Sequence, residues 1–185
     1  MKTVILYGTT EGQTRKVAEF AATELKKKGD DVTVVDAAAL PDAFDVKRYD
    51  LVVIAASLHA GHFQTPVVHA ARHHREALNG MFSVFLPVSL SAASNDPLDR
   101  KGLDECVARF QHDTGWSPHE LHHIAGAFRF AEYDYFKRWA MRLIAWDRGI
   151  KVDPSKDLEL TDWKDLAGYL EQLHASAASQ TALAL

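Results

Sequence analysis

Residues 3–14 read Thr-Val-Ile-Leu-Tyr-Gly-Thr-Thr-Glu-Gly-Gln-Thr, an apolar run followed by a short polar loop. Thr3–Tyr7 is continuously apolar after its first residue, which is typical of a strand buried on both faces of a sheet. A helical pattern of apolar residues begins at Thr14 and continues to Lys28, and Gly29 is a typical helix stop. A buried strand, a polar loop and a helix in this order predict the first unit of an α/β domain.

The same alternation of short β-branched runs and longer helical patterns continues along the chain. It predicts further strands over 31–36, 49–57, 82–88 and 121–130, and helices over 65–78, 97–114, 133–146 and 162–174. Five strands that alternate with helices predict a doubly wound α/β domain with a parallel sheet and right-handed crossovers. Neither a linker nor a repeat divides the chain, so we expect one domain over 1–174 and a frayed tail over 175–185.

Composition excludes several classes of protein. The chain has 185 residues, 47% of them hydrophobic and 25% charged, and its formal net charge of -4 gives no general attraction to nucleic acid. The single cysteine, Cys106, excludes an internal disulfide, a thiolate zinc site and an iron–sulfur cluster, and we expect it to be a core thiol. No apolar run is long enough to cross a bilayer and no signal-peptide pattern is present, so we expect a cytoplasmic protein.

The loop after the first strand, Gly8–Thr14, has the chemistry of an anion site. Gly12 permits close approach of a ligand to the backbone, and Thr9, Thr10 and Thr14 place hydroxyl groups beside the free N–H groups of the helix start. The loop lacks both the ending of a P-loop and the three-glycine fingerprint of dinucleotide-binding proteins. It therefore predicts a single phosphate site, with a loop that only caps its helix as the alternative.

Residues 7–15, Tyr-Gly-Thr-Thr-Glu-Gly-Gln-Thr-Arg, resemble the FMN-phosphate loop of flavodoxins, whose pattern is Ser/Thr-x-Thr-Gly-x-Thr. The resemblance implies a flavodoxin-like three-layer fold with a five-stranded sheet of order 2-1-3-4-5 and FMN beside the first and third strands. Glu11 stands where many flavodoxins have threonine, and its side chain can point outward while its backbone N–H faces the phosphate. The implied phosphate-binding residues are Thr9, Thr10, Glu11, Gly12, Gln13 and Thr14.

Two later loops, over 57–63 and 89–94, would flank the isoalloxazine ring in that fold. The second of them contains no aromatic residue, and neither loop has a carboxylate before Asp96. Because electron-carrying flavodoxins usually cover the ring with aromatic residues and surround it with acidic ones, a ring face would here be open to a substrate. The implied ring-binding residues are Ser57, Leu58, His59, Ala60, Gly61, Ser89, Leu90 and Ser91.

Several further motifs extend the resemblance to residues 1–174. They are Ala-Ser-Leu-His-Ala-Gly-His at 56–62, Pro-Val-Ser-Leu-Ser-Ala at 87–92, Ile-Ala-Gly-Ala-Phe-Arg-Phe at 124–130 and Leu-Thr-Asp-Trp at 160–163. Together they resemble the flavodoxin-like, menaquinone-dependent protoporphyrinogen dehydrogenases. The resemblance implies an FMN enzyme of heme biosynthesis that oxidises protoporphyrinogen IX and passes electrons to a quinone. A flavodoxin-type electron carrier and an NAD(P)H:quinone reductase of the same fold are the alternatives.

The segment 133–148 combines aromatic and basic residues. A basic amphipathic helix with tryptophans is typical of contact with a membrane surface or a large ligand, and an ordinary packed helix is the alternative. We expect peripheral contact with the inner membrane face through this helix, from Tyr133 to Arg148. The residues on which this expectation depends are Tyr135, Phe136, Lys137, Arg138, Trp139, Arg142, Trp146 and Arg148.

The ten histidines do not predict a metal site. His69 and His73 lie one helical turn apart, but no zinc motif or cysteine accompanies them, so we expect a solvated helix face and no metal. His59 differs because its loop should contact the flavin ring, and its ordinary pKa lies near neutrality. We therefore take His59 as the candidate catalytic residue, either as a donor to the flavin or as an acceptor of substrate protons.

Overall fold

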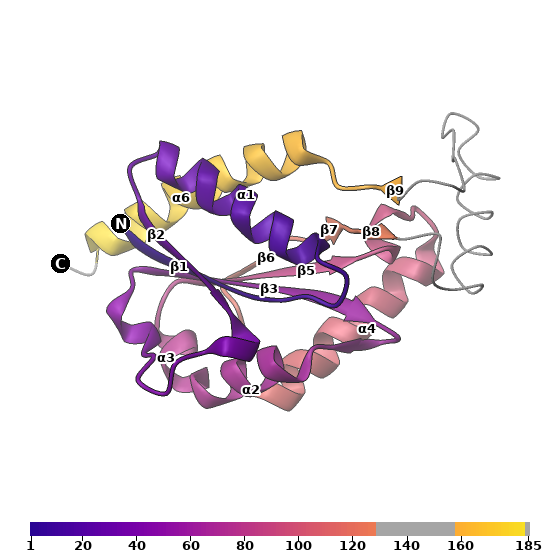
Figure 1. Ribbon diagram of the computed structural model, residues 1–185, viewed down its shortest axis with the longest axis horizontal. Helices are drawn as coiled ribbons and strands as arrows, with labels where there is room; N and C mark the ends of the chain where they lie inside the picture. The colour runs from indigo at the N-terminus through magenta and orange to yellow at the C-terminus, as the bar shows by residue number, and fades with distance from the viewer. Residues whose placement is uncertain (129–157, 184–185) are drawn as a thin grey trace.

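The computed structural model of the protein describes residues 1–128 and 158–183. Its centre is a parallel sheet in which the strands follow the order β2-β1-β3-β5-β6 (Figure 1). The chain contributes these strands as β1 Lys2–Gly8, β2 Asp31–Asp36, β3 Leu51–His59, β5 Ser83–Ser89, β6 Glu120–Leu121 and β7 Ile124–Ala125, which also pairs with β5. This is the flavodoxin-like order that the sequence predicts, with β5 as the fourth strand and β6 with β7 as the fifth.

Helices cover both faces of the sheet and complete the three layers. On one face lie α1 Gln13–Lys27 and α6 Trp163–Leu183, and on the other lie α2 Thr65–His73, α3 Arg75–Gly80 and α4 Pro97–Thr114 (Figure 1). Short 3-10 turns join the elements at Ala37–Ala39, Val46–Arg48 and Ser91–Ala93. Among the described residues, no helix combines the length and the apolar character needed to cross a membrane.

The apolar run of β1 explains how the two layers of helices are held. Alternate side chains of a strand point to opposite faces, so Ile5 and Tyr7 pack in the core beneath α1 and α6. Val4 and Leu6 pack in the second core, which is shared with α2 and α4. A strand that serves two cores must be apolar at every position, which is why a continuous apolar run predicted it correctly.

The predicted fifth strand over 121–130 is wrong as a single strand. Its first part divides into β6 and β7, which pair with opposite ends of β5, and His122 and His123 lie between them. Its last part, β8 Ala127–Phe128, leaves this sheet and pairs in antiparallel fashion with β9 Leu158–Glu159. The backbone groups of β8 thus find partners in a segment that is distant in the sequence, which local patterns cannot predict.

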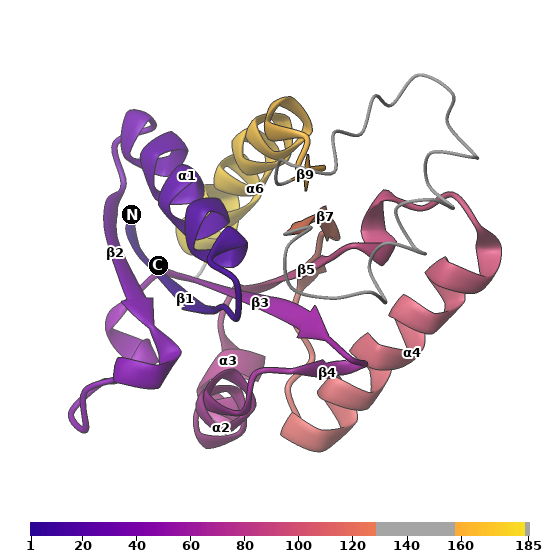
Figure 2. The ribbon, with the colours of Figure 1, turned by 45° about the vertical axis from the view of Figure 1, so that its right-hand side comes forward.

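Four smaller differences also appear. The helix expected over 65–78 divides at His74 into α2 and α3. A short strand that the sequence did not predict, β4 His62–Phe63, forms a hairpin with β3 (Figure 2). Cys106 on α4 is only half-buried, not a core thiol. Where the sequence predicted a frayed tail from Ala175, α6 continues to Leu183, and Ala177 is fully buried in the core that contains α1. The expected helix 133–146 lies outside the described residues.

Candidate functional site

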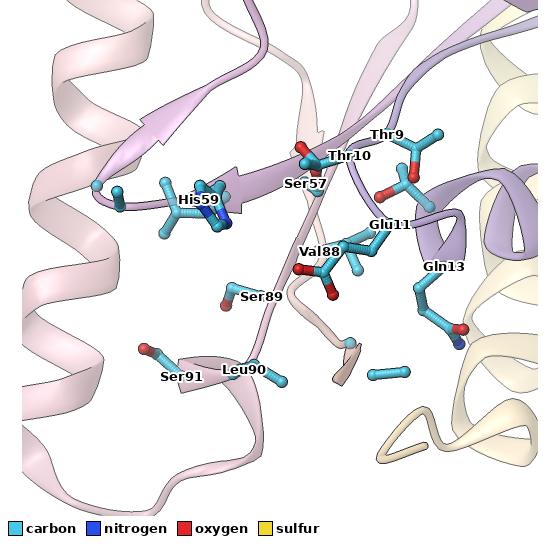
Figure 3. A pocket seen from close by; sticks show the side chains of 16 residues that line it. Thr9, Thr10, Glu11, Gln13, Ser57, His59, Val88, Ser89, Leu90 and Ser91 are labelled. Carbon is cyan, nitrogen blue, oxygen red and sulfur yellow. The ribbon is translucent and has the colours of Figure 1, made fainter. Parts of the chain in front are cut away.

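A cavity of about 370 Å³ opens at the carboxyl ends of β1, β3, β5 and β7, where a doubly wound sheet is expected to bind its ligand (Figure 3). All predicted cofactor-binding residues except Gly12 line this cavity. Three residues that were not predicted to bind the cofactor, Val88, Gly126 and Ala127, complete it. The lining residues are Thr9, Thr10, Glu11, Gln13, Thr14, Ser57, Leu58, His59, Ala60, Gly61, Val88, Ser89, Leu90, Ser91, Gly126 and Ala127.

The loop after β1 exposes hydrogen-bond donors at the start of α1. Gly12 precedes the helix with a φ of 92°, in the left-handed region, and its N–H donates to the Thr9 hydroxyl at 2.9 Å. No side chain caps the first turn of α1, so the N–H groups that every helix leaves unpaired at its start remain available to a ligand. Gly12 is not among the residues that line the cavity, and its positive φ turns the loop into α1.

Thr14 has a buried hydroxyl that no described residue pairs. Its side chain is fully buried and lines the cavity, yet its hydroxyl oxygen has no hydrogen-bond partner among the described residues. A buried hydroxyl without a partner costs about 1–3 kcal/mol, so such groups are normally paired. The position of Thr14 beside the uncapped turn of α1 suits an anion that accepts from both.

Glu11 occupies the cavity differently from what the sequence suggested. Its side chain lines the cavity and Figure 3 shows it directed between the loops, where an outward orientation was expected. It contributes the one carboxylate among the described lining residues. An anion would be repelled at this carboxylate, so the favourable position for an anion lies on the α1 side of the loop, near Thr14.

The loop after β3 is a tight hairpin. His59 pairs with His62 across Ala60 and Gly61, whose φ values of 48° and 81° are both positive, as a two-residue type I′ turn requires. His59 itself is exposed, at the edge of the cavity. The candidate catalytic imidazole therefore lies where a ligand in the cavity meets solvent.

Gln64 connects this hairpin to the loop after β1. Its side-chain amide donates to the Thr10 hydroxyl at 3.0 Å and also to the Ser57 hydroxyl. The amide oxygen of Gln64 is buried without a partner among the described residues. This side chain, which the sequence analysis did not single out, fixes two of the three predicted loops relative to each other.

The third predicted loop forms the far side of the cavity. Ser89 is buried at the end of β5 and its hydroxyl accepts from the Ala92 N–H at 3.1 Å, which closes the 3-10 turn over 91–93. Leu90 and Ser91 are half-buried and line the cavity. The described residues that line the cavity include no Trp, Tyr or Phe.

The histidine pair on α2 lies away from this cavity. His69 and His73 line a separate shallow groove with Leu40 and Pro66. Within 1–128 and 158–183, no three His, Cys, Asp or Glu side chains gather closely enough to hold a metal ion. The pair therefore offers at most two ligands among the described residues.

Comparison with known proteins agrees with this architecture. The model of the flavodoxin domain family matches residues 4–155, and a flavodoxin domain implies a flavin as the class of cofactor. A cysteine-to-serine variant of flavodoxin from Pseudomonas aeruginosa superposes with a TM-score of 0.59 at 17% identity, over 96% of this chain and 99% of that one. At that level of identity the likeness shows the fold alone.

Curated relatives narrow the family further. A protein named protoporphyrinogen IX dehydrogenase (quinone) from Escherichia coli K12 is 33% identical over 174 residues, which are 94% of this chain and 94% of the relative. A protein of the same name from Leishmania major is 28% identical over 166 residues, 88% of this chain and 70% of the relative. This chain is a flavodoxin-domain protein that belongs to the protoporphyrinogen IX dehydrogenase (quinone) family.

Proposed function

We propose that the cavity binds FMN with its phosphate against the loop after β1. The observation that supports this most directly is the Thr14 hydroxyl, which is fully buried and has no partner among the described residues. A phosphate beside it would accept from that hydroxyl and from the uncapped N–H groups of the first turn of α1. The loop would hold the phosphate through backbone N–H groups, hydroxyls or its conformation, and its residues are Thr9, Thr10, Glu11, Gly12, Gln13 and Thr14.

The isoalloxazine ring would lie between the β3–β4 hairpin and the loop after β5. The cavity of about 370 Å³ is within the ordinary size range of cofactor sites. Backbone groups of residues 57–61 and 89–91 would bind the ring edges, and Gly126 and Ala127 would bound the site from the side of β8. Since the loop over 89–94 contains no aromatic residue, the ring face on its side would be free for a flat substrate.

The reaction that we propose is oxidation of protoporphyrinogen IX with a quinone as the final electron acceptor. When bound, FMN would supply the group that accepts electrons from the substrate and passes them on to the quinone. The residues of the chain would orient the two partners and exclude water. His59, exposed at the edge of the cavity, would accept a proton that the substrate releases.

Anaerobic reduction tests this function. The FMN-loaded protein is mixed with protoporphyrinogen IX, and bleaching of the flavin absorbance is followed before a quinone is added. We expect the substrate to bleach the flavin, the quinone to restore its colour, and fluorescent porphyrin to form faster than with the apo-protein. Bleaching by NAD(P)H but not by the porphyrinogen would favour a quinone reductase. Reduction only by a partner protein would favour an electron carrier.

We also propose a cytoplasmic protein that contacts the inner membrane face peripherally through Tyr133–Arg148. The support is the sequence of this segment, whose tryptophans and basic residues suit an interface with anionic lipids. Each basic residue near such a surface contributes about 1 kcal/mol, so attachment would be reversible and sensitive to salt. Co-sedimentation with anionic liposomes at low salt, weakened by combining Arg138→Glu with Arg142→Glu, is the expected result. Equal sedimentation of the parent and the variant would contradict it.

A further inference from the structure

Gln13 lines the cavity at the start of α1, but its side chain is directed away from the loop that precedes it. Its amide nitrogen donates to a Glu159 carboxylate oxygen at 2.7 Å and to the Thr161 hydroxyl oxygen at 2.9 Å. Figure 3 shows this amide pointing toward the C-terminal part of the chain that leads into α6. The Gln13 side chain is 8% exposed, and its two partners are 146 and 148 residues away in the sequence.

The hydrogens available at this position explain why an amide suits it. Thr161 donates its single hydroxyl hydrogen to the Ala125 carbonyl at 2.6 Å, so toward Gln13 its oxygen can only accept. The Glu159 carboxylate also only accepts when ionised. Two acceptors therefore meet one residue that must supply two hydrogens from a single nitrogen, and the NH₂ group of glutamine does so.

The two partners of Gln13 support the side of the cavity opposite the phosphate loop. Glu159 pairs with Ala127 in the β8–β9 ladder, and the Leu160 N–H donates to the Gly126 carbonyl at 3.0 Å. Gly126 and Ala127 both line the cavity. The hydrogen bonds of Gln13 thus join the loop after β1 to the backbone that bounds the cavity on its β8 side.

We propose that Gln13 is a positioning residue that, through Glu159 and Thr161, fixes the distance between the phosphate loop and the Gly126–Ala127 side of the cavity. Its backbone N–H remains available to the phosphate, while its side chain sets how closely the flavin ring and its substrate are enclosed. The consequence for substrate binding rests on the proposed function of this cavity. The fixed distance itself belongs to the protein with or without a ligand.

The decisive variants change the hydrogen bonds of residue 13 while the side chain keeps a similar length and, in the double variant, the protein keeps its net charge. Gln13→Met has a similar length and no donor. The double variant, Gln13→Glu with Glu159→Gln, reverses the donor and the acceptor, keeps the net charge and restores one of the two hydrogen bonds. Glu159→Gln alone keeps an acceptor for Gln13. The matched control is Glu171→Gln, which alters another link to α1, the exposed ion pair of Lys28 with Glu171 at 2.6 Å.

Two measurements are made on the variants. Hydrogen exchange of the backbone over 124–128 and 158–161 is followed in the apo-protein, and KM and kcat for the porphyrinogen are determined in the FMN-loaded protein. In Gln13→Met we expect the backbone hydrogens of these two segments to exchange about tenfold faster than in the parent. We also expect its KM for the porphyrinogen to rise about tenfold, with a smaller change in kcat. The double variant should recover part of the slow hydrogen exchange of the parent. Only the apo-protein is compared for this variant, because its carboxylate at residue 13 would lie beside the proposed phosphate site. Glu159→Gln and Glu171→Gln should resemble the parent.

The proposal is overturned if the backbone hydrogens of both segments exchange in Gln13→Met at the parent rate, or if in the apo-protein they exchange as fast in the double variant as in Gln13→Met. If Gln13→Met does not fold, Glu159→Ala replaces it, because Glu159 is exposed and its truncation removes one of the two hydrogen bonds. Exchange that responds as expected in a protein that does not oxidise the porphyrinogen would refute the proposed function and leave the positioning role in place.

Discussion

The two sides of the sheet are built in different ways. Around β1 the ladders are continuous, from Lys2 paired with Asp31 to Tyr7 paired with Asp36, and on the other edge from Thr3 with Leu51 to Gly8 with Ala56. Beyond β5 the pairing is interrupted, since β6 pairs only at Val84 and Phe85 and β7 only at Val88 and Ser89. The first side presents the loop after β1, which we propose as the phosphate loop, and the second bounds the remainder of the cavity.

This difference separates what a local segment determines from what distant segments determine together. The turn of the loop after β1 is set by adjacent residues, through the positive φ of Gly12 and its hydrogen bond to Thr9, so substitutions there should change anion binding directly. The β8 side depends on Glu159 and Thr161, which lie far along the chain, so substitutions there should change the shape of the cavity. The following predictions test that division.

The largest effect is expected from Gly12→Val. Gly12 has a φ of 92°, and a β-branched residue in this region costs about 1–3 kcal/mol. Because space around a Cβ at this position is open, the cost arises from conformation and not from a clash. If the loop relaxes to avoid the strain, FMN affinity should fall about 10–100-fold in a fluorescence titration.

Gly29→Val is the matched control for this prediction. Gly29 has the same φ of 92° and equally open surroundings, but it follows the other end of α1 and is not among the lining residues. Both variants should lose similar stability in urea, about 1–3 kcal/mol, while Gly29→Val binds FMN like the parent. Equal losses of FMN affinity would mean that general destabilisation, and not the shape of the loop, controls binding.

Thr14→Val should have an intermediate effect, with opposite signs on stability and binding. The Thr14 hydroxyl is buried without a described partner, and valine replaces it with a methyl group of similar size. The apo-protein should keep its stability or gain up to about 1 kcal/mol, while FMN affinity falls about tenfold. Urea unfolding of the apo-protein and a flavin titration measure the two quantities.

A second buried threonine gives the comparison for Thr14→Val. The Thr114 hydroxyl donates to the Phe110 carbonyl at 2.8 Å and accepts from the Trp116 N–H at 3.3 Å. Thr114→Val should therefore destabilise the apo-protein by about 1–2 kcal/mol and leave FMN binding unchanged. A loss of stability in Thr14→Val like that of Thr114→Val would show that the Thr14 hydroxyl already has a partner without the ligand.

The same division explains how much the sequence could predict. The bounds of β2 were predicted correctly and those of α1 to within one residue, because an apolar period and a glycine stop are local features. All predicted loops lie at one cavity, since parallel strands bring their carboxyl ends to the same edge. The elements whose bounds were predicted well, β2 and α1, both adjoin β1.

The failures belong mainly to the other side. Val88, Gly126 and Ala127 line the cavity but are small or apolar, so the motifs over 87–92 and 124–130 that contain them did not identify them as lining residues. The interrupted fifth strand and the pairing of β8 with β9 depend on residues 158–161, which no local period connects to 120–128. The continuation of α6 past Ala175 follows from burial of Ala177 against the core that contains α1, and alanine and serine alone could not indicate it.

Gly126→Ala should have a smaller effect than the changes in the phosphate loop. Unlike Gly12, Gly126 does not need a positive φ, and an added Cβ would make ordinary contacts with Val88 at 3.4 Å and with the Ser89 backbone at 3.6 Å. Stability should therefore change by less than about 1 kcal/mol. The methyl group would narrow the cavity, so we expect FMN affinity to fall about threefold in the same titration. A loss as large as that of Gly12→Val would contradict the division between the two sides.

The smallest effect concerns the pH dependence of stability on the β7 side. Burial lowers the pKa of His123, which precedes β7, below its ordinary value of 6.5, although the Asp104 carboxylate at 3.7 Å opposes the shift. The neutral imidazole is thus favoured in the folded state, and the unfolded state binds more protons once the pH falls below 6.5. The stability that His123 contributes is complete above pH 6.5 and is lost as the pH falls toward its lower folded-state pKa. His123→Gln should flatten the fall in unfolding free energy between about pH 7 and 5. Urea unfolding at several pH values measures the slope, and the same slope in the parent and His123→Gln would show that this histidine is not the group that titrates.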